Sequence, residues 1–333
     1  MRFNSILVTG GAGFIGSHYA RLALKAHPGA KVTVVDKLTY AGNLANLADI
    51  RGRIRFVKAD IADAARMAPL FKGLQAVVHL AAETHVDRSI GGPEAFLRTN
   101  VLGTHCLLEA ARKAKVARFV AVSTDEVYGS RKSGFFREGD RLSPSSPYSA
   151  SKAASDLLAL SYHTTFGLPV VVTRCSNNYG PNQYPEKLIP LFITNLLEGK
   201  QVPVYGDGSN RRDWIYVEDH ARAIDLALTE GEPGEVYNID GRQEKDNLSV
   251  TRAVLKALGL GEDRIEHVKD RPGHDWRYAI DGRKLRALGF APREDFKSGI
   301  ARTVAWYCAN PGWWRPLKAG AFKAYYRKQY AKR

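Results

Sequence analysis

Two adjacent carboxylates follow a stretch that is typical of a buried strand. Residues 118–122 are rich in apolar side chains, and Asp125 and Glu126 come soon after them in the sequence VSTDEVYGS. Such a pair can supply a general acid and a general base, because burial and a neighbouring charge push two carboxyl pKa values apart. The residue types alone favour a solvated turn or a helix cap, so the chemical interpretation depends on the rest of the sequence.

A glycine-rich turn joins the first predicted strand to the first predicted helix. In TGGAGFIGSH the glycines include Gly10, Gly13 and Gly16, positions that need a sharp turn, close approach of a pyrophosphate and tight helix packing. The start of the helix adds N–H groups and a positive dipole. The next strand ends on Asp36, where a carboxylate bonds ribose hydroxyls and repels a 2′-phosphate. The pattern predicts NAD rather than NADP. The neighbouring Lys37 is the one residue here that argues for NADP.

Two more strand ends suit the same ligand. KADI places Asp60 where a carboxylate commonly meets the adenine amino group, although a cap for a helix over residues 61–71 explains it equally well. HLAAETHVDRS ends another strand in small residues. Small residues there leave room for a cofactor at the carboxyl edge of the sheet, where open α/β sheets bind ligands.

A tyrosine and a lysine lie one helical turn apart in YSASKAASD. Tyr148 and Lys152 therefore face the same side of a helix. Tyrosine with its usual pKa near ~10 is a poor base at neutral pH. The Lys152 ammonium and a cationic nicotinamide would favour the phenolate, so that Tyr148 could accept a proton from a sugar hydroxyl. Taken alone, the spacing also fits an ordinary exposed helix.

The elements that must position these residues alternate between β-branched runs and helical patterns. The expected strands are SILVTG, KVTVVD, IRFVKAD, QAVVHLAA, RFVAVST and VVVTRC, and the first expected helix covers residues 15–27. Strands with few polar residues that alternate with helices indicate a parallel sheet covered on both faces. The predicted fold class is α/β, with a Rossmann-type doubly wound sheet.

The pattern changes after Cys175. SNNYGPNQYPEK is rich in Asn, Pro and Gly, and helices are expected over residues 188–198, 217–229 and 249–258. We therefore predict a dinucleotide-binding domain over residues 1–175, with returns to its sheet near 214–240. A smaller, mostly helical C-terminal substrate lobe is predicted over residues 176–333.

The composition narrows the class of protein. The chain has 333 residues and 44% hydrophobic content, and its three cysteines show neither disulfide nor metal-site spacing. Neither an export signal nor a membrane span is predicted, which favours the cytoplasm. The net charge of +15 comes from residues spread along the chain, so a small anionic ligand is favoured over nucleic acid.

The motifs together resemble the extended short-chain dehydrogenase/reductase family, and within it the dTDP-glucose 4,6-dehydratases. TGGAGFIGSH, DKLTYAGN, AAETHVDRS, STDEVYG, PYSASKAASD, CSNNYGPNQYPEKLIP, YGDGSNRRDW and DRPGHDWRYAID carry the resemblance, from the first strand to about residue 315. It implies NAD-dependent dehydration of dTDP-glucose to dTDP-4-dehydro-6-deoxyglucose by a hydro-lyase, in which residues 176–333 bind the nucleotide sugar. STDEVYG is the most informative motif, because an epimerase of this fold transfers only hydride.

The resemblance also assigns the catalytic roles. Tyr148 removes the proton from the carbon 4 hydroxyl, Thr124 bonds the carbon 4 oxygen, and Lys152 holds the nicotinamide ribose. Glu126 is the base that removes the carbon 5 proton, and Asp125 is the acid that protonates the departing carbon 6 hydroxyl. Asp125 must be protonated at that moment, so its pKa is expected to be raised by burial or by the charge of Glu126.

The remaining predicted contacts fall into two sets. The predicted cofactor contacts are Gly10, Gly13, Phe14, Ile15, Gly16, Asp36, Lys37, Leu38, Thr39, Asp60, Ile61, Leu80, Ala81, Ala82, Thr84, Thr99, Tyr148, Lys152 and Asn178. The predicted substrate contacts are Thr84, Thr124, Asn177, Lys187, Leu188, Pro203, Tyr205, Arg212, Asn247, Arg271 and His274. Thr84 stands where many relatives have Ser, and the hydroxyl is retained. A metal site is not predicted.

Two alternatives to this function stay open. A 4,6-dehydratase of another nucleotide sugar, such as UDP-glucose, would need only a few different contacts around Tyr205. A catalytically silent, NAD-sensing scaffold would need only the cofactor site, and the complete set of catalytic side chains argues against it. The resemblance further implies a homodimer, and the composition favours neither a membrane nor a nucleic-acid partner.

Overall fold

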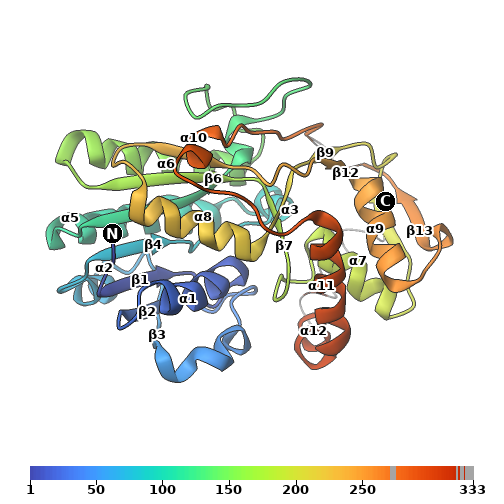
Figure 1. The fold of residues 1–333 in the computed structure, drawn as a ribbon, viewed down its shortest axis with the longest axis horizontal. Coiled ribbons are helices and arrows are strands. Elements are labelled where there is room, and N and C mark those ends of the chain that lie inside the picture. Colours follow the sequence, from blue (N-terminus) through green and yellow to red (C-terminus); the bar gives the residue numbers. More distant parts are fainter. Residues whose placement is uncertain (271–274, 320–321, 323–325, 327–333) are drawn as a thin grey trace.

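A seven-stranded parallel sheet forms the centre of the molecule (Figure 1). The computed structural model describes residues 1–270, 275–319, 322 and 326. The strands lie in the order β11-β6-β5-β4-β1-β2-β3. Their bounds are Ser5–Thr9 (β1), Lys31–Asp36 (β2), Arg55–Lys58 (β3), Ala76–His79 (β4), Arg118–Thr124 (β5), Val170–Cys175 (β6) and Val236–Ile239 (β11). The predicted doubly wound α/β fold is confirmed.

Helices cover both faces of this sheet because its strands are apolar on both sides. In β1, Ile6 and Val8 pack in one core, whereas Leu7 between them packs in the other. Successive side chains of a strand point to opposite faces, so both faces must be covered. The first face is covered by α1 (Phe14–Ala26) and α8 (Val217–Glu230), and the second by α2 (Ala64–Met67), α5 (Thr104–Ala114) and α6 (Pro147–Phe166).

The order of the strands opens a crevice beside β1. The chain adds β2 and then β3 on one side of β1, and places β4 on the other side. Connections that leave in opposite directions separate at the carboxyl ends of the strands, where doubly wound sheets bind ligands. The glycine turn that follows β1 lies at this point.

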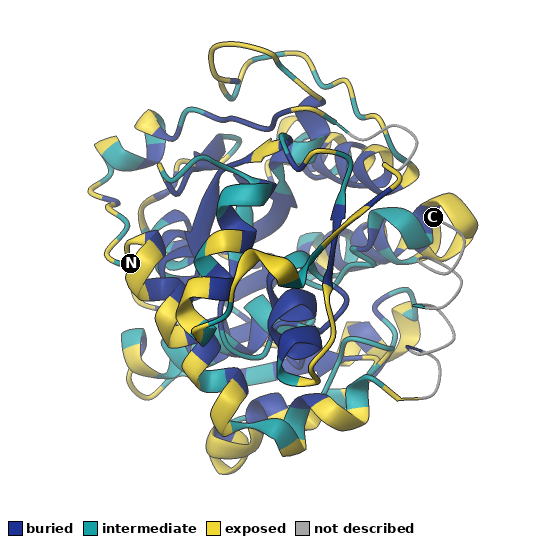
Figure 2. Cartoon of the chain, turned by 90° about the vertical axis from the view of Figure 1, so that its right-hand side faces the viewer, coloured by how far each residue is buried: buried dark blue, intermediate teal, exposed yellow. Residues whose placement is uncertain are grey.

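A second, smaller core lies beside the sheet, on the right of Figure 1. Its helices are α7 (Leu188–Leu197), α9 (Asn247–Leu258), α11 (Phe296–Ala309) and α12 (Pro311–Leu317). Tyr179, Trp214 and Phe296 pack against one another inside it. Figure 2 shows buried residues in the interior and exposed residues around the periphery. The mostly helical character predicted for this lobe is confirmed.

Short strand pairs and short helices complete the fold. The pairs are β7 (Asn177–Tyr179) with β10 (Trp214–Tyr216), β8 (Val202–Tyr205) with β13 (Ile265–Val268), and β9 (Arg211–Arg212) with β12 (Lys245–Asp246). The short helices are α3 (Val86–Gly91), α4 (Glu94–Phe96) and α10 (Arg283–Ala287). After β10 the chain returns to the main sheet through α8, which packs on α1, and β11, which pairs with β6.

Within the described residues, every helix is too short or too polar to cross a membrane.

Candidate active site

The glycine turn after β1 is too tightly packed for larger residues. Gly10 has a φ of +68°, and a Cβ there would lie 2.7 Å from the backbone of Ala81, which follows β4. A Cβ on Gly16 would lie 2.2 Å from the carbonyl oxygen of Gly10. Real Cβ atoms do not approach backbone this closely, so the first turn of α1 can pack on the strand only with glycine. The result is a cradle of backbone N–H groups that fits a dinucleotide pyrophosphate.

The acidic residue at the end of β2 is held in a fixed orientation. Asp36 accepts hydrogen bonds from the N–H of Ala12 at 3.0 Å and from the N–H of Leu38 at 2.8 Å. Burial raises the pKa of Asp36, and these two backbone bonds lower it. Asp36 lines the same cavity as the glycines, where its remaining lone pairs can accept from ribose hydroxyls.

Lys37 forms an ion pair within the chain. Its ammonium donates to Asp60 at 2.8 Å, so the cation that argued for NADP already has an acidic partner. Asp60 also accepts from the N–H of Ala62 at 3.0 Å. Helix α2 is capped instead by Asp63, which accepts from the N–H of Arg66 at 3.1 Å. The helix-cap explanation of Asp60 is therefore wrong, and Asp60 lines the cavity.

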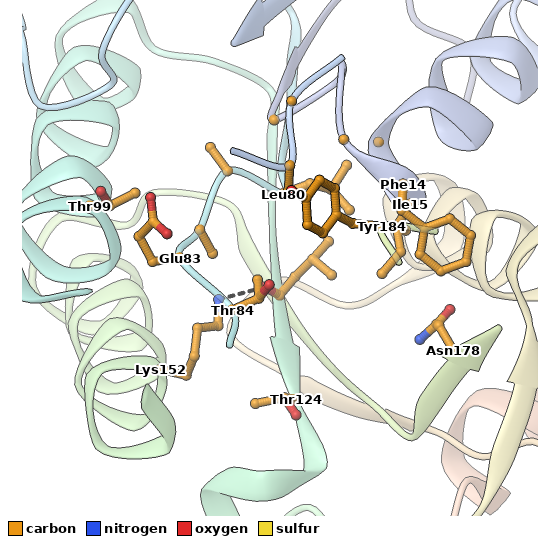
Figure 3. A pocket seen from close by; sticks show the side chains of 18 of the residues that line it. Phe14, Ile15, Leu80, Glu83, Thr84, Thr99, Thr124, Lys152, Asn178 and Tyr184 are labelled. Atoms are coloured by element: carbon orange, nitrogen blue, oxygen red, sulfur yellow. Dashed lines mark hydrogen bonds between the residues drawn. The ribbon is translucent and has the colours of Figure 1, made fainter. Parts of the chain in front are cut away.

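A cavity of about 300 Å³ extends from the glycine turn to the ends of β5 and β6. All but one of the predicted cofactor contacts line it, from Gly10 to Asn178, and they include both Tyr148 and Lys152. The exception is Leu38, which adopts a φ of +57° and turns the chain beneath Asp36. Figure 3 shows Thr84, Thr124, Lys152 and Asn178 around this space.

Helix α6 carries Tyr148 and Lys152 into the cavity. Ser146 is the N-cap of this helix and forms a capping box with Ser149 in its first turn, which fixes where the helix begins. Both side chains are buried, with exposed fractions of 7% for Tyr148 and 5% for Lys152. The Lys152 ammonium donates to the carbonyl of Val122 in β5 at 2.8 Å. The helix is thereby fixed against the strand that leads to the carboxylates.

Burial dominates the pKa values of this pair. Burial, followed by the charge of Glu126, raises the pKa of Tyr148, whereas a hydrogen bond with Thr124 lowers it. Burial lowers the pKa of Lys152, and the charge of Asp156 raises it. Burial therefore favours the neutral phenol of Tyr148, and the predicted phenolate depends on the cationic nicotinamide.

The two carboxylates lie on a 3-10 helix, Asp125–Tyr128, that begins directly after β5. Thr124 caps this helix by accepting from the N–H of Glu126 at 3.3 Å. Asp125 is only 2% exposed, and Thr124 Oγ1 donates to its Oδ1 at 3.4 Å. Burial, and next the charge of Glu126, raise the pKa of Asp125 well above its usual value. This direction agrees with the expectation that Asp125 is protonated.

A second cavity of about 180 Å³ adjoins the first. Glu126, Asn177, Glu186 and Lys187 line both cavities. The predicted substrate contacts that line the second cavity are Asn177, Lys187, Leu188, Pro203, Tyr205, Arg212 and Asn247. Thr84 and Thr124 line the first cavity. Arg271 and His274 lie outside the described residues.

Arg212 is fixed in the wall of the second cavity. Its guanidinium donates to the carbonyls of Arg211 at 2.7 Å and Asp275 at 2.9 Å, and it lies 4.2 Å from the centre of the Tyr278 ring. Tyr278 also lines this cavity, although it was not among the predicted contacts. The motif DWRYAID contains Tyr278, but its spacing alone did not show which of these residues faces the cavity.

Four side chains form a cluster beside the first cavity, and none of them was among the predicted contacts. The Arg88 guanidinium lies 4.1 Å from the centre of the Tyr40 ring and pairs with Glu186 at 2.9 Å. The Tyr40 ring meets the Tyr184 ring edge to face, with 5.4 Å between centroids. Tyr40, Tyr184 and Glu186 line the cavity. We call these four residues the Tyr40 clasp.

The part of the chain that the structure describes contains no group of three or more His, Cys, Asp or Glu side chains placed to hold a metal ion.

Known proteins resemble this chain over nearly its whole length. The GDP-mannose 4,6 dehydratase family profile matches residues 7–303. A dTDP-glucose 4,6-dehydratase from Streptomyces niveus is 56% identical, over 94% of this chain and 96% of that protein. One from Salmonella typhimurium is 51% identical, over 98% of each chain. The crystal structure of DesIV, a dTDP-glucose 4,6-dehydratase from Streptomyces venezuelae with NAD bound, matches with a TM-score of 0.93 at 54% identity, over 94% of this chain and 100% of that one.

Proposed function

Because the chain belongs to the GDP-mannose 4,6-dehydratase family, and matches dTDP-glucose 4,6-dehydratases over nearly its full length, we propose that it dehydrates dTDP-glucose with NAD as cofactor. The product is dTDP-4-dehydro-6-deoxyglucose, and the enzyme is a hydro-lyase. One observation carries the proposal. Tyr148, Asp125 and Glu126 line one cavity, and Glu126 also lines the adjoining cavity that contains Arg212.

The first cavity suits NAD. The glycine cradle receives the pyrophosphate, Asp36 bonds the adenosine ribose, and Lys152 holds the nicotinamide ribose. When bound, NAD takes a hydride from carbon 4 of the sugar and returns it to carbon 6, so the reaction has no net oxidation. The Lys37–Asp60 ion pair supports NAD over NADP, because Lys37 is already engaged.

Tyr148 and Thr124 act at carbon 4. Tyr148 accepts the hydroxyl proton as the carbon becomes a ketone, and Thr124 donates a hydrogen bond to the carbon 4 oxygen. The same Thr124 hydroxyl lowers the pKa of Tyr148. Burial opposes ionisation of Tyr148, so its proton leaves most readily when a positive nicotinamide ring lies beside it.

The two carboxyl groups then remove water. The carbon 4 ketone acidifies carbon 5, whose proton passes to Glu126. Asp125 gives its proton to the carbon 6 hydroxyl, which leaves as water. The pKa of Asp125, raised by burial and by Glu126, keeps that proton available. Glu126 finally returns a proton to carbon 5 as carbon 6 becomes a methyl group.

The second cavity suits the nucleotide diphosphate. The Arg212 guanidinium can make paired, charge-assisted bonds to phosphate oxygens. Leu188, Pro203, Tyr205 and Asn247 line this cavity. We assign Pro203 and Tyr205 to the contact with the base. Preference for dTDP over UDP depends on these contacts.

The assembly and location belong to the same proposal. The exposed apolar side chains Leu102, Leu157 and Phe166 support a homodimer, because each is more than half exposed. The three cysteines are free thiols in the structure, which suits a reducing cytoplasm. We keep residues 1–175 as the NAD-binding domain, with returns near 214–240, and residues 176–333 as the nucleotide-sugar-binding lobe.

The test is a panel of dTDP-, UDP- and GDP-glucose, each incubated with purified protein. We expect NMR to show a carbon 6 methyl group and a carbon 4 ketone, formed fastest from dTDP-glucose. A faster reaction of UDP-glucose would support the alternative dehydratase. An absence of product from all three sugars, in protein that binds NAD, would support the NAD-sensing scaffold.

A further inference from the structure

A buried ion pair lies behind the catalytic residues. Arg174 on β6 is 3% exposed, and Asp156 on α6 is 1% exposed. Arg174 Nε donates to Asp156 Oδ2 at 2.9 Å. Removing two charges from water is costly, and an apolar pair of similar volume is often equally stable. Global stability is therefore a weak explanation for keeping this pair at the centre of the fold.

Asp156 is connected to the residues that act at carbon 4. It follows Lys152 by one turn of α6 and Tyr148 by two turns, so the three side chains share one face of the helix. Its charge raises the pKa of Lys152, against the effect of burial. The Arg174–Asp156 pair thus fixes the middle of α6 against β6, the strand that lies between β5 and β11.

Arg174 also reaches the carboxylate pair. Its Nη1 donates to the hydroxyl of Tyr128 at 2.8 Å, and that hydroxyl donates to Asn238 Oδ1 on β11 at 2.9 Å. Tyr128 is buried and is the last residue of the 3-10 helix that begins with Asp125 and Glu126. Since this helix is only four residues long, anchoring Tyr128 restrains the carboxylates at its other end.

We propose that Arg174 is a positioning residue that holds the two halves of the catalytic machinery in register. Through Asp156 it fixes Tyr148 and Lys152, and through Tyr128 it fixes Asp125 and Glu126. The inference rests on the proposed function. The sugar oxidised at carbon 4 must meet the carboxylates without reorientation, and small misplacements of reacting groups reduce rates strongly.

The main test compares two buried tyrosines that each lose a hydroxyl. Tyr128→Phe removes the bond from Arg174 together with the bond to Asn238, whereas Tyr19→Phe removes a bond to Asp225 at 3.2 Å on the other side of the sheet. In Tyr128→Phe we expect kcat to fall ~10- to 100-fold with KM within about twofold, because positioning and not binding is lost. Reduced cofactor should accumulate during turnover, since elimination falls behind oxidation. Tyr19→Phe should show neither change.

A double variant tests whether the coupling passes through Arg174. Asp156→Asn alone should also lower kcat. The combined Asp156→Asn/Tyr128→Phe variant should lose less than the product of the two single losses, because both changes release the same guanidinium. Arg174→Lys keeps the charge and should recover part of the activity that Arg174→Met loses.

Different results would refute the proposed function and the positioning role of Arg174. Failure of the wild-type protein to make the 4-keto-6-deoxy product refutes the function and the inference built on it. With an active wild type, the inference is overturned if Tyr128→Phe turns over normally, if Tyr19→Phe shows the same loss, or if the two single losses multiply. Thermal melting curves ensure that only folded variants are compared.

Discussion

Asp125→Asn separates the two chemical tasks assigned to this site. Asparagine keeps the size of the side chain and an oxygen that can accept from Thr124, but it has no carboxylic proton to give. Tyr148 and the cofactor site stay intact in the variant, so oxidation at carbon 4 should proceed while water fails to leave. The expected state of the enzyme during turnover is therefore reduced cofactor with an oxidised, undehydrated sugar.

The expected loss of kcat in Asp125→Asn follows from the burial of the Asp125 side chain. General acid catalysis contributes typically ~10²- to 10⁴-fold, which corresponds to about 3–5 kcal/mol of barrier. Asp125 is 2% exposed, and its Oδ2 is buried from solvent. Water therefore has poor access as a substitute acid, and we expect kcat to fall toward the upper end of that range.

The Asp125→Asn substitution should lower kcat but should not lower the stability of the folded protein. The folded pKa of Asp125 is raised, so the folded state holds this proton at pH values where the unfolded state, with a pKa near ~3.9, has lost it. Stability therefore falls as the pH rises from the unfolded pKa to the folded pKa, by about 1.4 kcal/mol per pH unit. An uncharged asparagine side chain at this position removes this penalty. Above pH ~5 the Asp125→Asn variant should melt at an equal or higher temperature than the wild type.

Glu126→Gln is the variant to compare with Asp125→Asn, in an assay of deuterium exchange at carbon 5 and of product formation. In D₂O, Asp125→Asn retains the base at carbon 5, so that position should exchange deuterium although product is slow. Glu126→Gln should lose both exchange and product. Stopped-flow absorbance of the reduced cofactor, with NMR of carbon 5, measures both effects. Wild-type rates of dehydration in the two variants would refute the assignment and leave an epimerase-like oxidoreductase.

Three further outcomes follow from the same site. Tyr148→Phe should lose oxidation and elimination together, by ~10²- to 10⁴-fold, and near-normal turnover would show that another group takes the proton. Gly16→Ala should purify with little NAD(H), because its Cβ would lie 2.2 Å from the Gly10 carbonyl, whereas Gly52→Ala, with open space around it, should retain the cofactor of the wild type. Arg212→Gln should raise KM for dTDP-glucose at least ~10-fold, about 1.4 kcal/mol, with a smaller effect on kcat; an unchanged KM would contradict its assignment to the diphosphate.

Features that depend on short, fixed spacings were predictable from the sequence. The glycine turn, the acidic end of β2 and the Tyr148–Lys152 pair each lie within one or two adjacent elements, so local geometry determines their arrangement. The sheet followed from apolar strands that alternate with helices. The confirmed fold class therefore required no knowledge of which distant segments meet.

Features that depend on contacts between distant segments were not predictable in this way. Arg174 lies in VVVTRC, which shows only a buried strand, and its partners Asp156 and Tyr128 are 18 and 46 residues away. The order of β5 and β6 in the sheet brings the three together. The burial of Tyr148, which raises its pKa, was equally absent from the sequence pattern. The sequence pointed to Lys152 and a cationic nicotinamide but not to this burial, because the cost of burying a phenolate is a tertiary property.

The Tyr40 clasp has a consequence for the exchange of bound cofactor with the free nicotinamide cofactor of the cell. Tyr40 and Arg88 come from the first half of the chain and Tyr184 and Glu186 from the second, so opening that wall of the cofactor cavity requires their contacts to separate. A reaction that returns every hydride gives no reason for such opening. An enzyme that kept its cofactor behind these contacts would be insulated from changes in the cellular ratio of oxidised to reduced nicotinamide.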